Sequence, residues 1–297
     1  MELTHMSLTD DLITPSSAIP GPATAYQSDI ARYWDHEARP VNLRLGDVDG
    51  LYHHHYGIGE IDLAAIGDPA DSERERKVIA ELHRLESAQA DVLLDHLGDI
   101  PSTGTLVDAG CGRGGSMVMA HRRFGCRVEG MTLSTQQADF GNKRAAELGI
   151  ADFVRSRVAN MLNMPVGTGT VAGSWNNESS MYVDLHDLFA EHSRVLSVGG
   201  RYVTVTGCWN PRHGQPSKWV SRINAHFECN IHSRREYLRA MADNRLVPNA
   251  VIDLTPDTLP YWELRNTTSL VTGIEEAFIE SYKDGSFQYV LIAADRI

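Results

Sequence analysis

Several kinds of feature are missing from this sequence, and each absence argues against a class of protein. No apolar run approaches the ~20 residues that a membrane-spanning helix needs, and the N-terminus has no basic stretch followed by an apolar one. The cysteines form no CxxC pair and no cluster with histidines, so neither a disulfide framework nor a zinc site is indicated; they are Cys111, Cys126, Cys208 and Cys229. We therefore expect a cytoplasmic protein that is neither exported nor anchored.

Positive charge is also scarce. The chain has 27 Lys and Arg against 39 Asp and Glu, which gives a formal net charge of −12. Such a surface repels nucleic acid and anionic membranes over about a Debye length, ~8 Å. Of the 297 residues 42% are hydrophobic and 22% charged, which is ordinary for a soluble globular protein. We therefore expect a small-molecule partner, with no nucleic acid and no membrane.

The first hundred residues divide into three parts. Residues 1–24 are rich in Ser, Thr and Pro without periodicity and indicate a disordered leader. Residues 26–71 are irregular and dense in Tyr, Trp, His and Gly, and we interpret them as a binding lid. Ser72 and Glu75 have the spacing of a capping box, and the apolar positions that follow predict a long helix ending near Gly98.

Strand-like and helix-like segments alternate through the rest of the chain. Such alternation predicts a mostly parallel sheet with helices on both faces. The predicted strands are 105–110, 127–134, 153–158, 171–176, 201–207, 247–255 and 287–297, and the predicted helices are 114–124, 135–148, 184–196 and 262–283.

The segment "LVDAGCGRGG" places four glycines within residues 110–115, between a predicted strand and a predicted helix. Glycines there let a ligand approach the main chain at the carboxyl edge of the sheet. A P-loop is excluded because no Gly-Lys-Ser/Thr follows, and the match to a dinucleotide fingerprint is weak evidence. Asp108, two residues before the first glycine, would repel a pyrophosphate but suits a cationic ligand that carries an ammonium and a sulfonium. S-adenosylmethionine is such a ligand.

The glycine segment "VDAGCGRG" and the strand "VEGMTLS" resemble two motifs of the class I S-adenosylmethionine-dependent methyltransferases. The resemblance implies a Rossmann-like, seven-stranded, mostly parallel sheet with helices on both faces and added lid segments. Where the family usually has an acidic residue on the cofactor ribose, this chain has Thr132, and Gln137 is the substitute we consider. The expected cofactor contacts are Asp108, Ala109, Gly110, Gly112, Thr132, Leu133, Gln137, Asn160, Met161 and Asn176.

Longer segments of the sequence indicate a particular subgroup of these methyltransferases. Residues 31–59, "SWNNES", residues 206–244 and "LTPDTLPYWELR" are similar to the geranyl diphosphate 2-C-methyltransferases. The resemblance implies methylation of geranyl diphosphate at C2 for 2-methylisoborneol biosynthesis, with Mg²⁺ as a second cofactor and S-adenosylhomocysteine as product. We expect one domain over residues 25–297, with a lid over about 25–100 and an inserted cap over about 207–245. We further expect a homo-oligomer. The alternatives are a sterol or fatty-acyl alkene C-methyltransferase and a non-catalytic sensor of S-adenosylmethionine or a prenyl diphosphate.

C-methylation of an alkene requires a base, a cage that stabilises a cation without capturing it, and an anchor for the diphosphate. Glu178 follows the fourth predicted strand and is our candidate base, with the substrate's own diphosphate as its rival. Tyr56 and Phe227 are the candidate cage aromatics. We assign no metal ligands, because "HHHYG" lacks a partner at zinc spacing and Mg²⁺ prefers diphosphate and water oxygens. The candidate diphosphate donors are Asn42, Arg44, Lys218, Arg222, Arg234 and Arg235.

Overall fold

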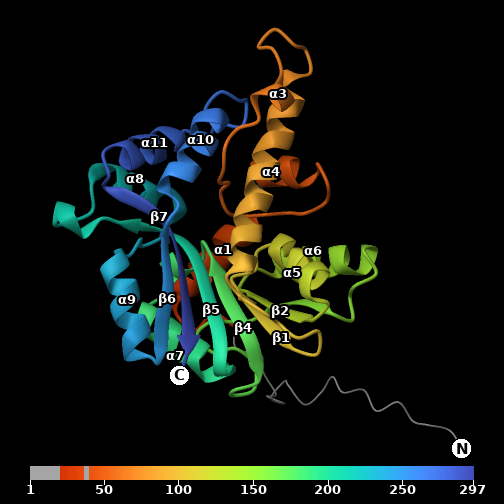
Figure 1. The fold of residues 1–297 in the computed structure, drawn as a ribbon, viewed down its shortest axis with the longest axis vertical. Helices are drawn as coiled ribbons and strands as arrows, with labels where there is room; N and C mark the ends of the chain where they lie inside the picture. The colour runs from red at the N-terminus through yellow and green to blue at the C-terminus, as the bar shows by residue number, and fades with distance from the viewer. Residues whose placement is uncertain (1–20, 37–39) are drawn as a thin grey trace, which may run out of the picture.

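The computed structural model describes residues 21–36 and 40–297, so most of the predicted leader lies outside the described residues. Its centre is a seven-stranded sheet in the order β3-β2-β1-β4-β5-β7-β6 (Figure 1). The five strands from β3 to β5 run parallel, while β7 is antiparallel to both β5 and β6. This confirms the predicted mostly parallel sheet. The strands are β1 Thr105–Ala109, β2 Arg127–Thr132, β3 Val154–Val158, β4 Val171–Asn177, β5 Leu196–Trp209, β6 Leu246–Asp253 and β7 Phe287–Arg296.

Both faces of the sheet are covered. Leu106 and Val107 are neighbours in β1, yet they belong to different hydrophobic clusters, because successive side chains of a strand point to opposite faces. α4 (Arg74–Asp95), α5 (Gly115–Phe124) and α6 (Thr135–Glu147) contribute residues to the first cluster. α7 (Leu185–Val195) and α9 (Arg234–Asp243) contribute to the second and pack against each other. These clusters keep the strands in place and fix the positions of their ends.

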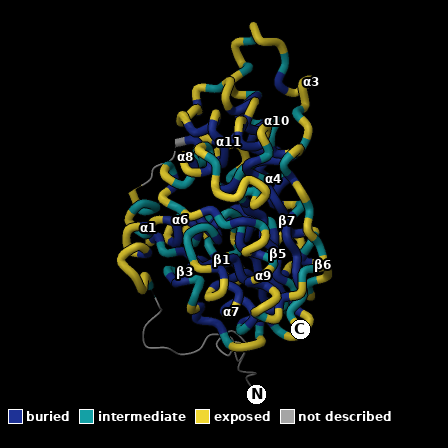
Figure 2. Tube along the Cα trace, turned by 90° about the vertical axis from the view of Figure 1, so that its left-hand side faces the viewer, coloured by how far each residue is buried: buried dark blue, intermediate teal, exposed yellow. Residues whose placement is uncertain are grey.

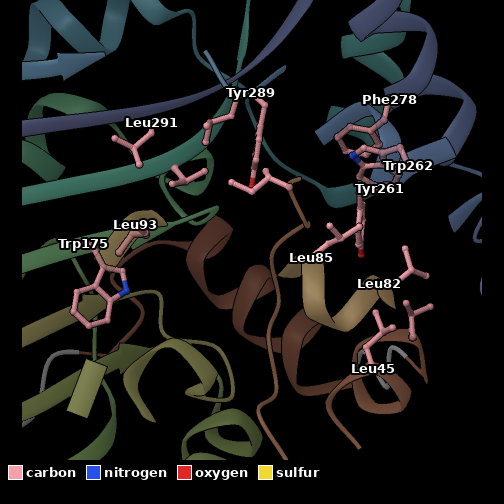
Figure 3. Packing of buried hydrophobic residues seen from close by; sticks show 14 of the residues in the cluster. Leu45, Leu82, Leu85, Leu93, Trp175, Tyr261, Trp262, Phe278, Tyr289 and Leu291 are labelled. Atoms are coloured by element: carbon pink, nitrogen blue, oxygen red, sulfur yellow. The ribbon is translucent and has the colours of Figure 1, made fainter. Parts of the chain in front are cut away.

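A layer of helices lies beyond the carboxyl ends of the strands (Figure 1). α8 (Lys218–Phe227) packs on α11 (Glu275–Lys283), α11 on α10 (Thr255–Arg265), and α10 on α4. Figure 3 shows Tyr261 of this layer beside Leu85 of α4, with Trp262 and Phe278 packed together above it. The Trp262 and Phe278 rings stack with centroids 3.9 Å apart. The remaining helices are α1 (Ala25–His36), α2 (Pro40–Gly46) and α3 (Leu63–Ile66), with the short 3-10 turns Ser180–Tyr182 and Pro211–His213.

Burial follows this arrangement. Figure 2 shows buried residues concentrated along the sheet strands and exposed residues at the tips of the outer loops, for example beside α3. Among the described residues, no helix is both long enough and apolar enough to cross a membrane.

Three predictions of local structure are wrong. The segment 26–71 was expected to be irregular, but it contains α1, α2 and α3. The stretch 262–283 was expected to be one helix, but α10 and α11 are separated by a turn in which the carboxylate of Glu275 accepts hydrogen bonds from the backbone N–H groups of Thr272 and Gly273. The capping box of Ser72 and Glu75 does not form: the long helix begins at Arg74 without a side-chain cap, and Glu75 accepts a hydrogen bond from Ser269. By contrast, the capping box of Ser233 and Glu236 forms at the start of α9.

Candidate active site

Two cavities adjoin one another beyond the carboxyl ends of β1, β2 and β4. One is lined by the glycine loop and by residues that follow β2 and β3, and we call it the loop cavity. The other is lined mainly by aromatic side chains, and we call it the aromatic cavity. Four residues line both: Trp34, His54, Glu178 and Tyr182. A ligand in one cavity would therefore lie close to a ligand in the other.

The glycine loop leaves bare backbone on the wall of the loop cavity. Gly110 has φ 94° and Gly112 φ 53°, a region that residues with a Cβ adopt at a cost. A Cβ on Gly110 would overlap the Ser179 side chain, and one on Gly112 would lie 2.9 Å from Cδ2 of His54. The backbone N–H groups of Gly110 and Cys111 donate to the carbonyl of Met131, which ties the loop to the end of β2. The loop thus forms a cradle that a side chain would fill.

Polar side chains gather on the opposite part of this wall. The Thr132 hydroxyl donates to Oε1 of Gln137 over 2.7 Å, and Asn160 donates from Nδ2 to Oε1 of Gln27 over 2.8 Å. Gln27 belongs to α1, and Asp35 of the same helix accepts a hydrogen bond from the Ser134 hydroxyl at 2.6 Å. Helix α1 therefore forms part of the cavity wall and is attached to the residues that precede α6.

Seven of the ten predicted cofactor residues line the loop cavity: Gly110, Gly112, Thr132, Leu133, Gln137, Asn160 and Met161. Asp108, Ala109 and Asn176 lie behind it. Asn176 donates from Nδ2 to the carbonyl of Ala109, and its Oδ1 accepts from Tyr202 and His192, so it supports the glycine loop from below. The sequence analysis missed the residues from α1, Gln27, Ile30 and Trp34, because that segment was not interpreted as a helix.

Asp108 is only 2% exposed, and burial raises the pKa of its carboxyl group to about 8. Its Oδ1 atom has no hydrogen-bond partner among the described residues. A buried carboxyl group with an unsatisfied oxygen, two residues before the first glycine of a bare-backbone cradle, fits a ligand whose positive charge would stabilise its ionised form. The residues of the loop cavity therefore fit S-adenosylmethionine.

Eight aromatic side chains line the aromatic cavity: Trp34, Tyr56, Tyr182, Phe227, Phe278, Tyr282, Phe287 and Tyr289. The structure brings the two predicted cage residues together through Phe278. The Tyr56 ring centroid is 5.1 Å from that of Phe278, and the Phe227 ring centroid is 6.2 Å from it. These ring faces can stabilise a cation without forming a covalent bond to it.

Glu178 lies on the wall common to both cavities. It has φ 50°, which is uncommon for a residue with a side chain and typical of functional positions. Its Oε1 atom accepts hydrogen bonds from the backbone N–H of Tyr56, at 3.1 Å, and from the hydroxyl of Tyr289. Burial raises the pKa of its carboxyl group to about 8, against the lowering effect of these donors. A carboxyl group with that pKa can both take and release a proton near neutrality.

The basic residues predicted to hold a diphosphate lie elsewhere. Asn42 lines the aromatic cavity and donates from Nδ2 to the carbonyl of His53. Arg222 pairs with Glu276 at 2.8 Å, and Arg44 lies 3.6 Å from Glu75. Residues on exposed helix surfaces point to solvent, which sequence spacing does not reveal. Those that line neither cavity are Arg44, Lys218, Arg222, Arg234 and Arg235.

The cation that does line the aromatic cavity is Arg265, at the end of α10. It is 6% exposed, its Nε lies 3.3 Å from Oε1 of Glu275, and its guanidinium carbon is 5.1 Å from the Trp262 ring centroid. Sequence reasoning missed it. The available signal was an arginine within the apolar helix segment "YWELR", where a charge is unusual unless it is paired.

The three histidines of "HHHYG" differ in their surroundings: His53 and His55 are buried against each other, whereas His54 lines both cavities. His53 and His55 are buried, with Nδ1 of His53 3.2 Å from Nε2 of His55, and burial lowers the pKa of His55 to about 4. Arg113 of the glycine loop donates to Nε2 of His54 over 2.8 Å. Within the part of the chain that the structure describes, no three His, Cys, Asp or Glu residues are grouped to hold a metal ion.

The sheet order, the glycine cradle after β1 and the cavity beyond the carboxyl ends of the strands define a class I methyltransferase. Residues 75–222 match the family model described as mycolic acid cyclopropane synthetase. A geranyl diphosphate 2-C-methyltransferase of Streptomyces ambofaciens is 79% identical over 97% of this chain and 99% of its own length. One of Saccharopolyspora erythraea is 60% identical over 93% of this chain and 96% of its own.

Solved structures agree. The geranyl diphosphate C-methyltransferase of Streptomyces coelicolor, in complex with Mg²⁺, geranyl-S-thiolodiphosphate and S-adenosyl-L-homocysteine, is 80% identical and superposes with a TM-score of 0.93. That match covers 94% of this chain and 100% of the other. This chain belongs to the geranyl diphosphate 2-C-methyltransferases.

Proposed function

We propose that this chain transfers the methyl group of S-adenosylmethionine to C2 of geranyl diphosphate, yielding (E)-2-methylgeranyl diphosphate, the precursor of 2-methylisoborneol. The observation that carries the proposal is the position of Glu178. Its carboxylate belongs to the wall shared by a cavity that fits S-adenosylmethionine and a cavity lined by aromatic rings. A methyl donor and an alkene in adjoining cavities have the proximity that transfer requires.

S-adenosylmethionine supplies the methyl group as an electrophilic carbon attached to a positive sulfur. The electron pair of the C2=C3 bond forms the new bond from C2 to that carbon, while the S–CH₃ electrons remain on sulfur. Positive charge then resides at C3, where the rings of Tyr56 and Phe227 stabilise it. Glu178 takes the proton from C2, and the electrons of that C–H bond restore the alkene. Atoms and charges balance, with S-adenosylhomocysteine and one proton as the other products.

Arg265 and Asn42 are our candidates for the diphosphate end of the aromatic cavity. A guanidinium offers a planar set of donors that matches phosphate oxygens, and the carboxylate of Glu275 holds it in place. Mg²⁺ would neutralise diphosphate charge through the substrate's own oxygens and water. We propose that α1 covers the loop cavity and α8 the aromatic cavity, since α1 contributes Gln27, Ile30 and Trp34 to the first and α8 contributes Ile223 and Phe227 to the second.

The test is incubation of the purified chain with S-adenosylmethionine, Mg²⁺ and dimethylallyl, geranyl or farnesyl diphosphate, with products analysed by mass spectrometry after phosphatase treatment. We expect a product heavier by one methylene from geranyl diphosphate and markedly less from the others, because each misplaced methylene in a fitted pocket costs ~1–3 kcal/mol. Geraniol should not react, because it lacks the anchor. Equal turnover of all three diphosphates, or methylation of a sterol or an unsaturated acyl chain instead, would contradict the proposal.

A further inference from the structure

A series of hydrogen bonds extends from Glu178 through Tyr289, on the wall of the aromatic cavity, to the buried side chain of Gln89. Tyr289 of β7 donates its hydroxyl hydrogen to Oε1 of Glu178. Nε2 of Gln89, a fully buried residue of α4, donates to the Tyr289 oxygen at 3.1 Å. Gln89 also pairs with Asn177, which precedes Glu178: Nε2 donates to Oδ1 of Asn177 at 2.7 Å, and Nδ2 of Asn177 donates to Oε1 of Gln89 at 2.9 Å.

The number of available hydrogen atoms determines which group donates and which accepts in this series of hydrogen bonds. Tyr289 has a single hydroxyl hydrogen, and an ionised Glu178 can only accept one. The side-chain amides of Gln89 and Asn177 each donate to the other. Exchanging the oxygen and nitrogen positions of only one of them would therefore place two oxygens against each other. Reversing both would direct the Tyr289 hydrogen to Oε1 of Gln89 and leave Glu178 without that donor. The orientation seen here is the one in which Gln89 donates to Tyr289 and Tyr289 donates to Glu178.

We propose that Gln89 is a positioning residue for the base: through Tyr289, it holds a hydrogen-bond donor on Glu178 and so favours the ionised carboxylate that accepts the C2 proton. This inference rests on the proposed function for its catalytic meaning. A hydrogen bond received by the Tyr289 oxygen polarises its O–H group and strengthens the bond that it donates.

The ionisation of Glu178 also depends on the other groups around it. Burial raises its pKa and the nearby carboxylate of Glu86 raises it further, whereas the donors Tyr289 and the N–H of Tyr56 lower it. Other titratable or charged groups line the same two cavities: His54, His55, Tyr182, Cys229, Arg265 and Tyr282. A substitution at position 89 changes none of these groups, but it removes the pairing with Asn177 as well as the contact with Tyr289. The substitution is therefore made both with and without the Tyr289 hydroxyl.

The experiment measures the pKa of Glu178 by NMR in protein labelled with ¹³C at glutamate carboxyl groups, without substrate, with Glu178→Gln to assign the signal. Tyr289→Phe should raise the pKa by about 1–2 units, the effect of losing a hydrogen bond to a charged group. Gln89→Met, which keeps the length and removes the donor, should raise it by roughly 0.5–1 unit. In a chain that already carries Tyr289→Phe, Gln89→Met should add less than about 0.2 unit, because the path through the phenol is gone. The acid limb of kcat/KM against pH should move by the same amounts.

Glu81→Gln is the matched control, since Glu81 is a buried carboxylate on the same helix whose partners are Arg84 and the N–H of Asp62. It should leave the Glu178 pKa unchanged. If Gln89→Met leaves that pKa at the wild-type value, or shifts it equally with and without Tyr289, the proposal is overturned. Gln89→Leu replaces Gln89→Met if the latter does not fold. The NMR result needs no turnover, so failure of methyl transfer to geranyl diphosphate would refute the proposed function and leave this test standing.

Discussion

Ser179 lies directly against Gly110, so that a Cβ on the glycine would overlap the serine side chain. The Ser179 hydroxyl donates to the carbonyl of Ala109 at 2.7 Å and accepts from Nδ2 of Asn176 at 2.9 Å. The turn after β4 is therefore packed on the loop after β1, and it holds the glycine cradle and Glu178 in one rigid arrangement. Adding a side chain in the cradle should therefore reduce the affinity for the cofactor more than it reduces the free energy of unfolding.

Gly110→Ala should lose most affinity for S-adenosylmethionine, because the methyl group must displace Ser179 and the residue must keep φ 94°. We expect at least a tenfold rise in Kd, measured by calorimetry. Gly149→Ala is the control: that glycine also has positive φ, 71°, but a Cβ there meets nothing within 4 Å. It should share the backbone cost, about 1 kcal/mol of stability, and keep cofactor affinity. Equal affinities in the two variants would refute the role of the cradle.

Glu178→Gln should preserve cofactor binding and lose turnover by 10²–10⁴-fold, the usual range for removal of a positioned general base. The measurement is kcat with geranyl diphosphate at saturating S-adenosylmethionine. Glu81→Gln, which removes a buried carboxylate that lines neither cavity, should keep kcat within about twofold. A loss of less than fivefold in Glu178→Gln would assign the base role to the substrate's diphosphate or to water.

The free energy of unfolding should fall as pH rises from about 5 to 8. Asp108 and Glu178 have folded pKa values of about 8, raised by burial above ordinary values near 4. In that window the unfolded chain has released these protons and the folded chain retains them, so higher pH favours unfolding by up to ~1.4 kcal/mol per group and pH unit. Urea unfolding at pH 5.5 and 8 should show a shallower dependence in Asp108→Asn. The exposed Asp152→Asn serves as control, and an unchanged slope in Asp108→Asn would mean that Asp108 is ionised when folded.

Phe227→Leu should lower kcat roughly 2- to 30-fold with KM for geranyl diphosphate little changed. A ring face is worth ~0.5–2 kcal/mol to a desolvated cation, and the C3 cation exists only after the alkene has attacked. Steady-state kinetics distinguish this from loss of packing, which would raise KM alone. Phe189→Leu is the matched change in the other hydrophobic cluster, where the ring packs on Tyr202. It should cost stability but not kcat.

Arg265→Met should reduce kcat/KM for geranyl diphosphate at least 30-fold, because loss of one member of a buried ionic contact costs ~2–5 kcal/mol. The substitution is combined with Glu275→Gln, so that no buried carboxylate is left without its partner. As a control, the Kd for S-adenosylmethionine shows whether the rest of the site is intact. The same exchange at Arg222, whose ion pair with Glu276 is exposed, should change kcat/KM less than about threefold. A larger loss of kcat/KM from the Arg222 substitution than from the Arg265 substitution would support Arg222, as predicted from the sequence, as the residue that binds the diphosphate.

Local sequence signals correctly predicted some features that depend on neighbours in the chain, although the Ser72–Glu75 capping box was not among them. The positive φ values of Gly110 and Gly112 follow from a glycine run between a strand and a helix, and the Ser233 capping box forms within one helical turn. Local sequence signals failed to predict a helix where aromatic and polar residues alternate. Helix α1 is amphipathic, but its segment "AYQSDIARYWDH" contains aromatic and polar residues on both sides, and we interpreted it as irregular.

From the sequence alone we could predict the parallel sheet and the cofactor loop and propose Tyr56 and Phe227 as cage residues and Glu178 as base, because each depends on residue type, on strand order or on resemblance to a family. Only the tertiary structure decided that Arg265 lines the aromatic cavity and which groups contact Glu178. Arg265 of α10 and Tyr289 of β7 line the aromatic cavity beside Glu178, and Gln89 of α4 contacts Tyr289 from behind. Tyr289 and Gln89 are 200 positions apart in the chain. Contacts over such separations are made by the packing of helices on the sheet, and no periodicity or spacing in the sequence encodes them.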